Sequence, residues 1–277
     1  MAGKKALCVG INKFKHLPPE NWLNGCVNDT ADMISILKKY MGFSDSDIVR
    51  LTDDQATKKK IMDNLTEMVN GAKAGKYENL VFSISSHGTQ VPDLNRDESD
   101  MEDEAFCPTD LAQKGDVWDP KHVILDDELY NLFIQLPDNV SLEGFFDTCH
   151  SGTGLKSIDF LLSRKPRFLL PPSLKALKKA QEGSPRSMAV ALKEKGLSTR
   201  HTLWAACRSG QTSADANIDG VWHGAFTYYL CKNMNQCENK LGRKDILARV
   251  RTDLKKNEYD QVPQLETNAA KRKGKCE

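Results

Sequence analysis

The chain has 277 residues, 39% of them hydrophobic, which is enough to bury the core of one large domain or of two small ones. Its 39 basic and 38 acidic residues nearly balance, and the formal charge of +1 argues against binding of nucleic acid or of a membrane surface by the whole molecule. No segment approaches the roughly 18 consecutive apolar residues of a membrane helix.

The cysteines and the start of the chain indicate the compartment. None of the eight cysteines forms a C-x-x-C pair, which argues against a zinc module and against a dense disulfide scaffold. The chain opens M-A-G-K-K without a charged-then-apolar leader. We therefore expect a reduced, cytoplasmic protein.

Apolar segments with the spacing of buried strands alternate with segments that have the spacing of amphipathic helices. The expected strands are residues 5–11, 47–51, 80–84, a segment from Leu142 to the turn at Ser151, and 202–206. The expected helices run from Asn28 or Asp29 to Tyr40, onward from Thr57, and over 126–136, 223–234 and 243–254. This alternation predicts an α/β fold with a mostly parallel sheet and helices on both faces.

Residues 163–200 contain prolines and many lysines and arginines but no convincing strand. Such a segment is typical of an exposed linker that proteases can reach. A basic linker or surface helix with no role in processing is the alternative.

Two expected strands end in residues that can carry out catalysis. The strand 80–84 runs into S-S-H-G, which contains His87, and the strand beginning at Leu142 runs into D-T-C-H-S-G, which contains Asp147 and Cys149. Ligands and catalytic groups lie at the carboxyl ends of parallel strands, so a Cys–His dyad is expected there. A buried structural cysteine is the alternative reading of Cys149.

In this dyad the Cys149 thiolate attacks a peptide carbonyl, and His87 takes the thiol proton and later protonates the leaving amine. The backbone N–H groups of Gly88 and Cys149, in turns after strands, are the expected donors to the oxyanion. His150 points to the opposite face and is expected to be an orienting or structural group. No third orienting residue can be identified from the sequence.

The motifs S-S-H-G-T-Q and D-T-C-H-S-G resemble those of the metacaspases, which are caspase-like cysteine peptidases. Residues 24–32, 124–129, 206–215 and 261–265 resemble further family segments in the same order. The resemblance implies a caspase-like fold in which residues 1–162 form a large-subunit-like part and 201–277 a small-subunit-like part. Residues 163–200 would then be a linker, and one that the enzyme itself could cut.

The resemblance also implies a pocket for an Arg or Lys side chain, formed by Asp29 and Asp147 with Ser85. Cys26, which precedes Asp29 in the same loop-to-helix turn, is also assigned to it. Carboxylates suit a guanidinium, which they can bind bidentately, or an ammonium. The alternative reading of Asp29 is a simple helix N-cap.

Calcium activation is a further implication. Asp126 and Asp127 match the paired aspartates that bind Ca²⁺ in calcium-dependent members, with another ligand from Asp100 or Asp103. The family's additional acidic ligand beyond the cysteine falls near Lys156 here, and a solvated acidic loop is the alternative. No organic cofactor is expected.

The sequence therefore predicts a monomeric cysteine endopeptidase that acts on proteins or peptides after Arg or Lys. One alternative is a peptidase of the same clan with a different specificity. The other is a catalytically silent caspase-like scaffold that binds partners; it would be expected to lack the His or the Cys, and both are present.

Overall fold

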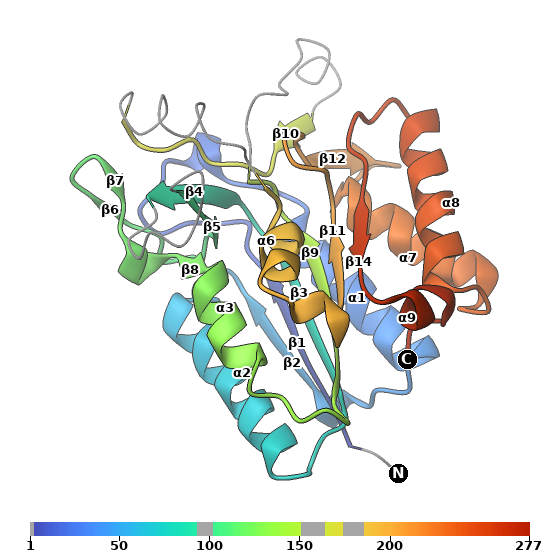
Figure 1. The fold of residues 1–277 in the computed structure, drawn as a ribbon. Helices are drawn as coiled ribbons and strands as arrows, with labels where there is room; N and C mark the ends of the chain where they lie inside the picture. Colours follow the sequence, from blue (N-terminus) through green and yellow to red (C-terminus); the bar gives the residue numbers. More distant parts are fainter. Residues whose placement is uncertain (1–2, 93–101, 151–163, 174–185) are drawn as a thin grey trace.

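The computed structural model describes residues 3–92, 102–150, 164–173 and 186–277, and its centre is a sheet of six strands in the order β14-β11-β9-β3-β1-β2 (Figure 1). All neighbouring pairs are parallel except β11 and β14. The strands are β1 (Lys4–Gly10), β2 (Ile48–Thr52), β3 (Asn79–Ser85), β9 (Ser141–Asp147), β11 (Thr202–Ala205) and β14 (Gln264–Glu266). The expected mostly parallel sheet is confirmed.

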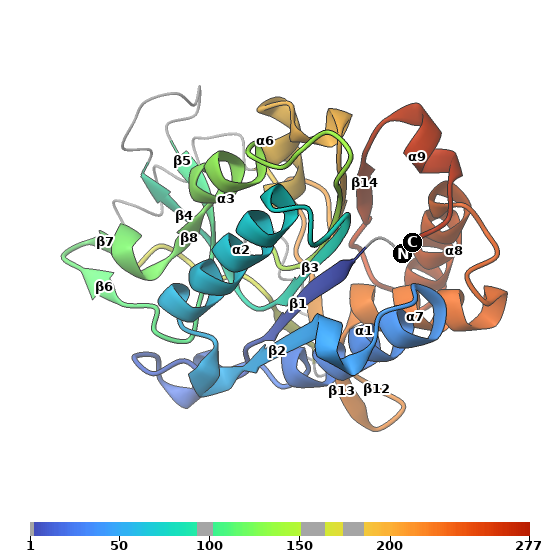
Figure 2. The same cartoon turned by 90° about the horizontal axis from the view of Figure 1, so that it is seen from below.

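Helices cover both faces of this sheet (Figure 2). One face carries α1 (Cys26–Tyr40), α7 (Ala225–Cys237) and α8 (Arg243–Lys256), and the other carries α2 (Lys58–Lys73), α3 (Asp126–Phe133) and α6 (Met188–Glu194). The short helix α9 (Ala269–Lys273) follows β14. Alternate residues of a strand point to opposite faces, so Leu7 and Val9 of β1 enter one core while Ala6 and Cys8 enter the other.

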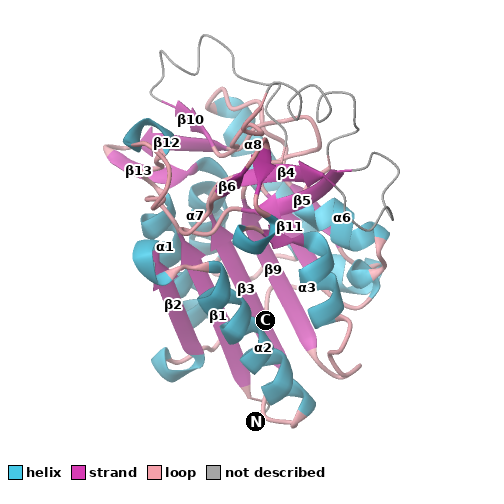
Figure 3. Cartoon of the chain, turned by 90° about the vertical axis from the view of Figure 1, so that its left-hand side faces the viewer, coloured by secondary structure: helices cyan, strands magenta, loops and turns pink. Residues whose placement is uncertain are grey.

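Two small antiparallel sheets lie beyond the carboxyl ends of the central strands (Figure 3). One contains β4 (Gly88–Pro92), β5 (Glu102–Phe106) and β8 (Ile124–Leu125), and the other contains β10 (Arg164–Pro166), β12 (Ala214–Ile218) and β13 (Val221–Gly224). The strands β6 (Gln113–Lys114) and β7 (Val117–Trp118) form a separate hairpin. The turns that carry His87 and Cys149 therefore lie between the central sheet and these small sheets.

Most expected elements are present within a few residues, but two boundaries were wrong. Helix α1 begins at Cys26 with Gly25 as its N-cap, so neither Asn28 nor Asp29 caps it. His223 belongs to β13 and not to the following helix, which begins at Ala225. Asp29 therefore does not cap α1, and His223 is not part of α7. The side chains of both residues make contacts with other elements.

The expectation of an exposed linker without a strand was also wrong for its described parts. Residues 164–166 form β10, residues 188–194 form α6, and the side chain of Arg167 is completely buried. Arg167 can be buried because three buried carboxylates complement its charge. Residues 163 and 174–185 of the linker lie outside the described residues. In the described part of the chain, every helix is too short or too polar to span a membrane.

Candidate active site

Three buried carboxylates surround the guanidinium of Arg167. Arg167 Nη2 lies 2.8 Å from Asp29 Oδ2 and 3.0 Å from Asp215 Oδ1, and Nη1 lies 3.3 Å from Asp147 Oδ1. Nη1 also donates to Ser85 Oγ. These residues come from the first turn of α1, the ends of β3 and β9, and β12. The structure therefore brings Asp29, Ser85 and Asp147 together around an arginine of the linker.

Hydrogen bonds hold these carboxylates in place. Asp147 accepts from Ser213 Oγ (2.8 Å), from Thr227 N (3.0 Å) and from Thr227 Oγ1 (2.7 Å). Asp29 accepts from Gly224 N at 2.9 Å. Burial raises the pKa of Asp147 despite the nearby Arg167, whereas at Asp29 burial is outweighed by Arg167 and by hydrogen bonds, which lower the pKa.

Asp215 is a pocket residue that was not predicted. It lies in the segment 206–215, which resembles a family segment, but the sequence alone gave no reason to place its side chain in the pocket. Its carboxylate accepts from Asn24 N (2.8 Å) and Gly25 N (2.9 Å), which ties β12 to the start of α1. The one sequence feature that points to this role is that Asp215 is an acidic residue at the end of a family-like segment.

Gly224 provides the space that the guanidinium fills. A Cβ atom at this position would lie 2.1 Å from Asp147 Oδ2 and 2.4 Å from Arg167 Nη1. Its φ of −70° is accessible to any residue, so the requirement for glycine is one of space and not of backbone conformation. An alanine would therefore occupy the pocket.

The carbonyl group of Arg167 lies between two backbone donors. Its oxygen accepts from Gly88 N at 3.0 Å and from Cys149 N at 3.1 Å, the two groups expected to bind an oxyanion. The two turns come together because residue 88 lacks a side chain, since a Cβ there would lie 2.1 Å from the carbonyl oxygen of Cys149. The side chain and the carbonyl of Arg167 thus occupy the two parts of one site.

The residues before Arg167 extend this interaction as a strand. β10 pairs antiparallel with β12, with Arg164 opposite Ala216 and Pro166 opposite Ala214. Arg167 N then donates to the carbonyl oxygen of Ser213 at 3.0 Å. Addition of an extended segment to the edge of a sheet is a common way in which proteins bind peptides.

His87 is buried, and its orientation is set by the backbone. Its Nε2 lies 2.7 Å from the carbonyl oxygen of Asn21, which can only accept, so Nε2 carries the proton. Burial lowers the pKa of His87 to about 4, which keeps the ring neutral and leaves a lone pair on Nδ1. The carbonyl of Asn21 is an orienting group that the sequence did not reveal, because every residue carries the same backbone group.

Cys149 is also buried, and its Sγ donates to the carbonyl oxygen of Gln211 and lies 3.7 Å from Cys207 Sγ. His150 packs against Phe106 with ring centroids 5.7 Å apart, and burial lowers its pKa to about 3. A neutral, apolar-packed ring agrees with a structural role for His150.

Cys26 is the first residue of α1, and its thiol is buried near the guanidinium of Arg167. Burial raises the pKa of this thiol well above its ordinary value, although the positive charge of Arg167 opposes that rise. Cys26 therefore lies beside the pocket as a neutral thiol.

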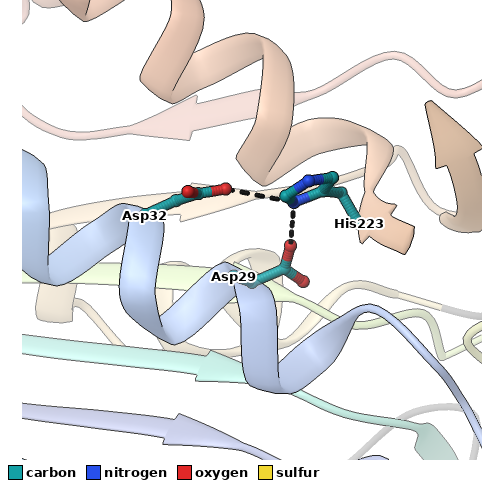
Figure 4. Close-up of side chains that lie close together, drawn as sticks. All are labelled: Asp29, Asp32 and His223. Carbon is teal, nitrogen blue, oxygen red and sulfur yellow. Dashed lines mark ion pairs between the residues drawn. The ribbon is translucent and has the colours of Figure 1, made fainter. Parts of the chain in front are cut away.

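His223 lies beside Asp29 and Asp32, with its ring between their two carboxylates (Figure 4). Its Nδ1 is 3.1 Å from Asp32 Oδ2 and 3.8 Å from Asp29 Oδ1. Burial opposes the charge of this ring, but its interactions with the two carboxylates outweigh burial and raise its pKa to about 9. His223 is therefore a cation that offsets part of the negative charge of the pocket.

The expected calcium ligands lie elsewhere. The carboxylates of Asp126 and Asp127, at the start of α3, contact Nζ of Lys195, which is 3.4 Å from Asp126 Oδ2. Asp103 is buried on β5, and Asp100 lies outside the described residues. In the part of the chain that is described, these aspartates do not bring three ligand atoms within 4.8 Å of one another.

Comparisons with known proteins identify the family of the chain. The family model "Metacaspase, peptidase C14 domain" matches residues 4–158. Metacaspase-1 of Meyerozyma guilliermondii is 31% identical, with 96% of this chain and 69% of that protein covered. Metacaspase-1 of Cryptococcus neoformans is 30% identical, with 95% of this chain and 62% of that protein covered. Metacaspase-1A of Aspergillus clavatus is 32% identical, with 95% of this chain and 65% of that protein covered. The chain thus spans roughly two thirds of the length of these relatives.

Two solved structures share the fold. Protein GSU0716 from Geobacter sulfurreducens has a TM-score of 0.67 at 24% identity, with 98% of this chain and 97% of that chain covered. Caspase-1 from Spodoptera frugiperda has a TM-score of 0.58 at 12% identity, with 96% and 88% covered. The expected caspase-like fold is confirmed, and the chain belongs to the metacaspases, a family of caspase-like cysteine peptidases of the C14 type.

Proposed function

We propose that this chain is an endopeptidase that cleaves after arginine or lysine and that the first bond it cuts is its own Arg167–Phe168 bond. The observation that carries the proposal is the position of Arg167, whose side chain and carbonyl contact the acidic pocket and the two backbone donors at once. A caspase-like site selective for Asp would need basic groups where this site has three carboxylates. Arginine suits it best because its fork can bind several carboxylates together.

The chemistry follows the usual course of a cysteine peptidase. The Cys149 thiol gives its proton to Nδ1 of His87 and its sulfur attacks the Arg167 carbonyl carbon. The oxyanion keeps the hydrogen bonds from Gly88 N and Cys149 N while the bond to Phe168 N breaks. The protonated His87 protonates the leaving amine, and water then hydrolyses the thioester. The hydrogen bond from Cys149 Sγ to Gln211 must break before the attack.

The linker supports this proposal on both sides of the bond. Residues 164–166 pair with β12, and after the bond Leu169 N donates to Gly88 O at 2.9 Å. Chain on both sides of Arg167 is therefore held in an extended path through the site, as a substrate would be. A loop that merely covers the site would not need the Arg167 carbonyl between the two N–H donors.

Mass spectrometry of the purified chain tests the proposal. We expect a new N-terminus at Phe168, which disappears in Cys149→Ala and His87→Ala and in Arg167→Gln. Peptides with Arg, Lys, Asp or Asn before the bond are tested with the same enzyme. Cleavage after Asp or Asn would contradict the pocket, and a chain that cuts neither itself nor any peptide would favour a scaffold.

Calcium activation also belongs to this proposal. Asp126, Asp127 and Asp103 would hold the ion. The contacts of Asp126 and Asp127 with Lys195 show that the pair attracts a cation, but in the described structure the three aspartates do not bring three ligand atoms within 4.8 Å of one another. Lys195 lies in the linker, so bound Ca²⁺ would compete with a linker contact. Activity is measured against Ca²⁺ and chelator, and full activity in excess chelator would contradict this part of the proposal.

A further inference from the structure

We infer that residues 257–259, at the end of α8, form a second specificity site, which accepts a guanidinium three residues before the cleaved arginine. We call residues 257–259 the Tyr259 site. The inference rests on the proposed cleavage after arginine and adds a substrate requirement to it.

The linker shows how such a side chain is bound. The guanidinium carbon of Arg164 lies 3.8 Å from the centroid of the Tyr259 ring. Its Nη1 donates to the carbonyl oxygen of Glu258 at 2.7 Å, and its Nη2 donates to that of Asn257 at 2.9 Å. One planar cation thus stacks on an aromatic face and donates to two neighbouring carbonyls.

The end of α8 is built to present these carbonyls. Tyr259 N donates to Leu254 O (3.0 Å) and Glu258 N donates to Lys255 O (3.2 Å), the two bonds of a Schellman motif. Glu258 has a φ of +59°, the left-handed conformation that this motif requires and that is uncommon for a residue other than glycine. The carbonyls of residues 257 and 258 then point away from the helix, at its negative end, where a cation is favoured.

The ring of Tyr259 is held independently of the linker. It packs edge to face on Tyr229 of α7, with centroids 6.0 Å apart. The next residues are tied to the active site, since Gln211 Nε2 donates to Asp260 O at 2.6 Å and Ala214 N donates to Gln261 Oε1 at 3.0 Å. The Tyr259 site therefore keeps a fixed position relative to β12 and to the loop of Gln211.

The register of β10 on β12 sets which substrate residue reaches this site. Consider a peptide whose arginine carbonyl binds Gly88 N and Cys149 N and whose preceding residues pair with β12 as β10 does. The residue three positions before that arginine then lies at Tyr259, as Arg164 does in the linker. Two carbonyls and a flat ring match a guanidinium better than an ammonium. We therefore expect the order arginine, then lysine, then a neutral side chain at that position.

Three fluorogenic peptides test the inference: acetyl-Arg-Lys-Pro-Arg, acetyl-Lys-Lys-Pro-Arg and acetyl-norleucine-Lys-Pro-Arg amides, assayed with the self-processed full chain in calcium. We expect kcat/KM to be about tenfold higher for the first than for the third, with the second between them. In Tyr259→Leu the ratio of the first to the third should fall to about one. The matched control Tyr40→Leu, at a tyrosine that contacts Lys39 on the far end of α1, should keep the ratio near ten.

Equal rates for the three peptides with the wild-type chain would overturn the Tyr259 site while leaving cleavage after arginine in place. Cleavage of none of them, with cleavage of a peptide that ends in another residue, would instead overturn the proposed function. Because the readout is a ratio, a general loss of activity in a variant cancels. If Tyr259→Leu does not fold, the wild-type ratio alone decides.

Discussion

Replacing Arg167 by methionine, in a Cys149→Ala background that cannot cut itself, should strongly destabilise the chain. The substitution removes the cation from Asp29, Asp147 and Asp215, which lie within 3.3 Å of it and are at most 2% exposed. Breaking a buried ion pair by removing one partner costs about 3–5 kcal/mol. Water can enter the emptied pocket, and the raised pKa of Asp147 lets this carboxyl take up a proton, so we expect a loss near the lower end of this range. A loss of about 3 kcal/mol lowers the Tm by roughly 6–12 °C in a chain of this size.

Differential scanning calorimetry at pH 7 measures this shift. The matched control is Lys193→Met. Lys193 is a half-exposed residue of the same linker that pairs with Glu266 of β14, and its loss should change the Tm by no more than about 2–3 °C. The destabilisation by Arg167→Met should shrink on acidification, because protonated carboxyls no longer need the cation. If Arg167→Met melts at the temperature of its parent at pH 7, the three carboxylates do not depend on the Arg167 cation.

Three further predictions concern the pocket and its surroundings. Gly224→Ala should lower kcat/KM for arginine peptides at least 100-fold, because its Cβ would lie 2.1 Å from Asp147 Oδ2, while circular dichroism should show that the fold is retained. Wild-type rates would show that the pocket does not need the space at residue 224. The pKa of His223 is raised to about 9 from an ordinary value of 6.5, so the charged ring should stabilise the fold fully below pH 6.5 and lose this effect as the pH rises through 9. The measurement is the difference in Tm between the wild type and His223→Asn, and a difference that does not change between pH 6 and 10 would refute the prediction. Lys195→Met should lower the Ca²⁺ concentration needed for half-maximal activity, and an unchanged titration would exclude competition at Asp126.

The sequence predicted the parts of this site that depend on local pattern. The apolar strands that end in His87 and Cys149 can be identified one at a time, and the parallel sheet then brings their ends together. The role of Arg167 could not be predicted this way, because a charged residue in a basic linker is normally exposed. Its burial depends on Asp29, Asp147 and Asp215, which are far apart in the chain and meet only after folding.

The contacts of Arg167 also determine the state of the enzyme after a first cut. If the Arg167–Phe168 bond breaks, Arg167 becomes a chain end that is still connected to Cys149 and still carries the guanidinium that the three carboxylates hold. A tethered ligand of this kind acts at an effective concentration of roughly millimolar, well above that of most substrates. Its new carboxylate would be repelled by the same aspartates, but the two N–H donors of Gly88 and Cys149 would favour it. A single cut would therefore leave much of the enzyme occupied by its own product, and a step that draws the linker away from the site is needed before another protein can enter.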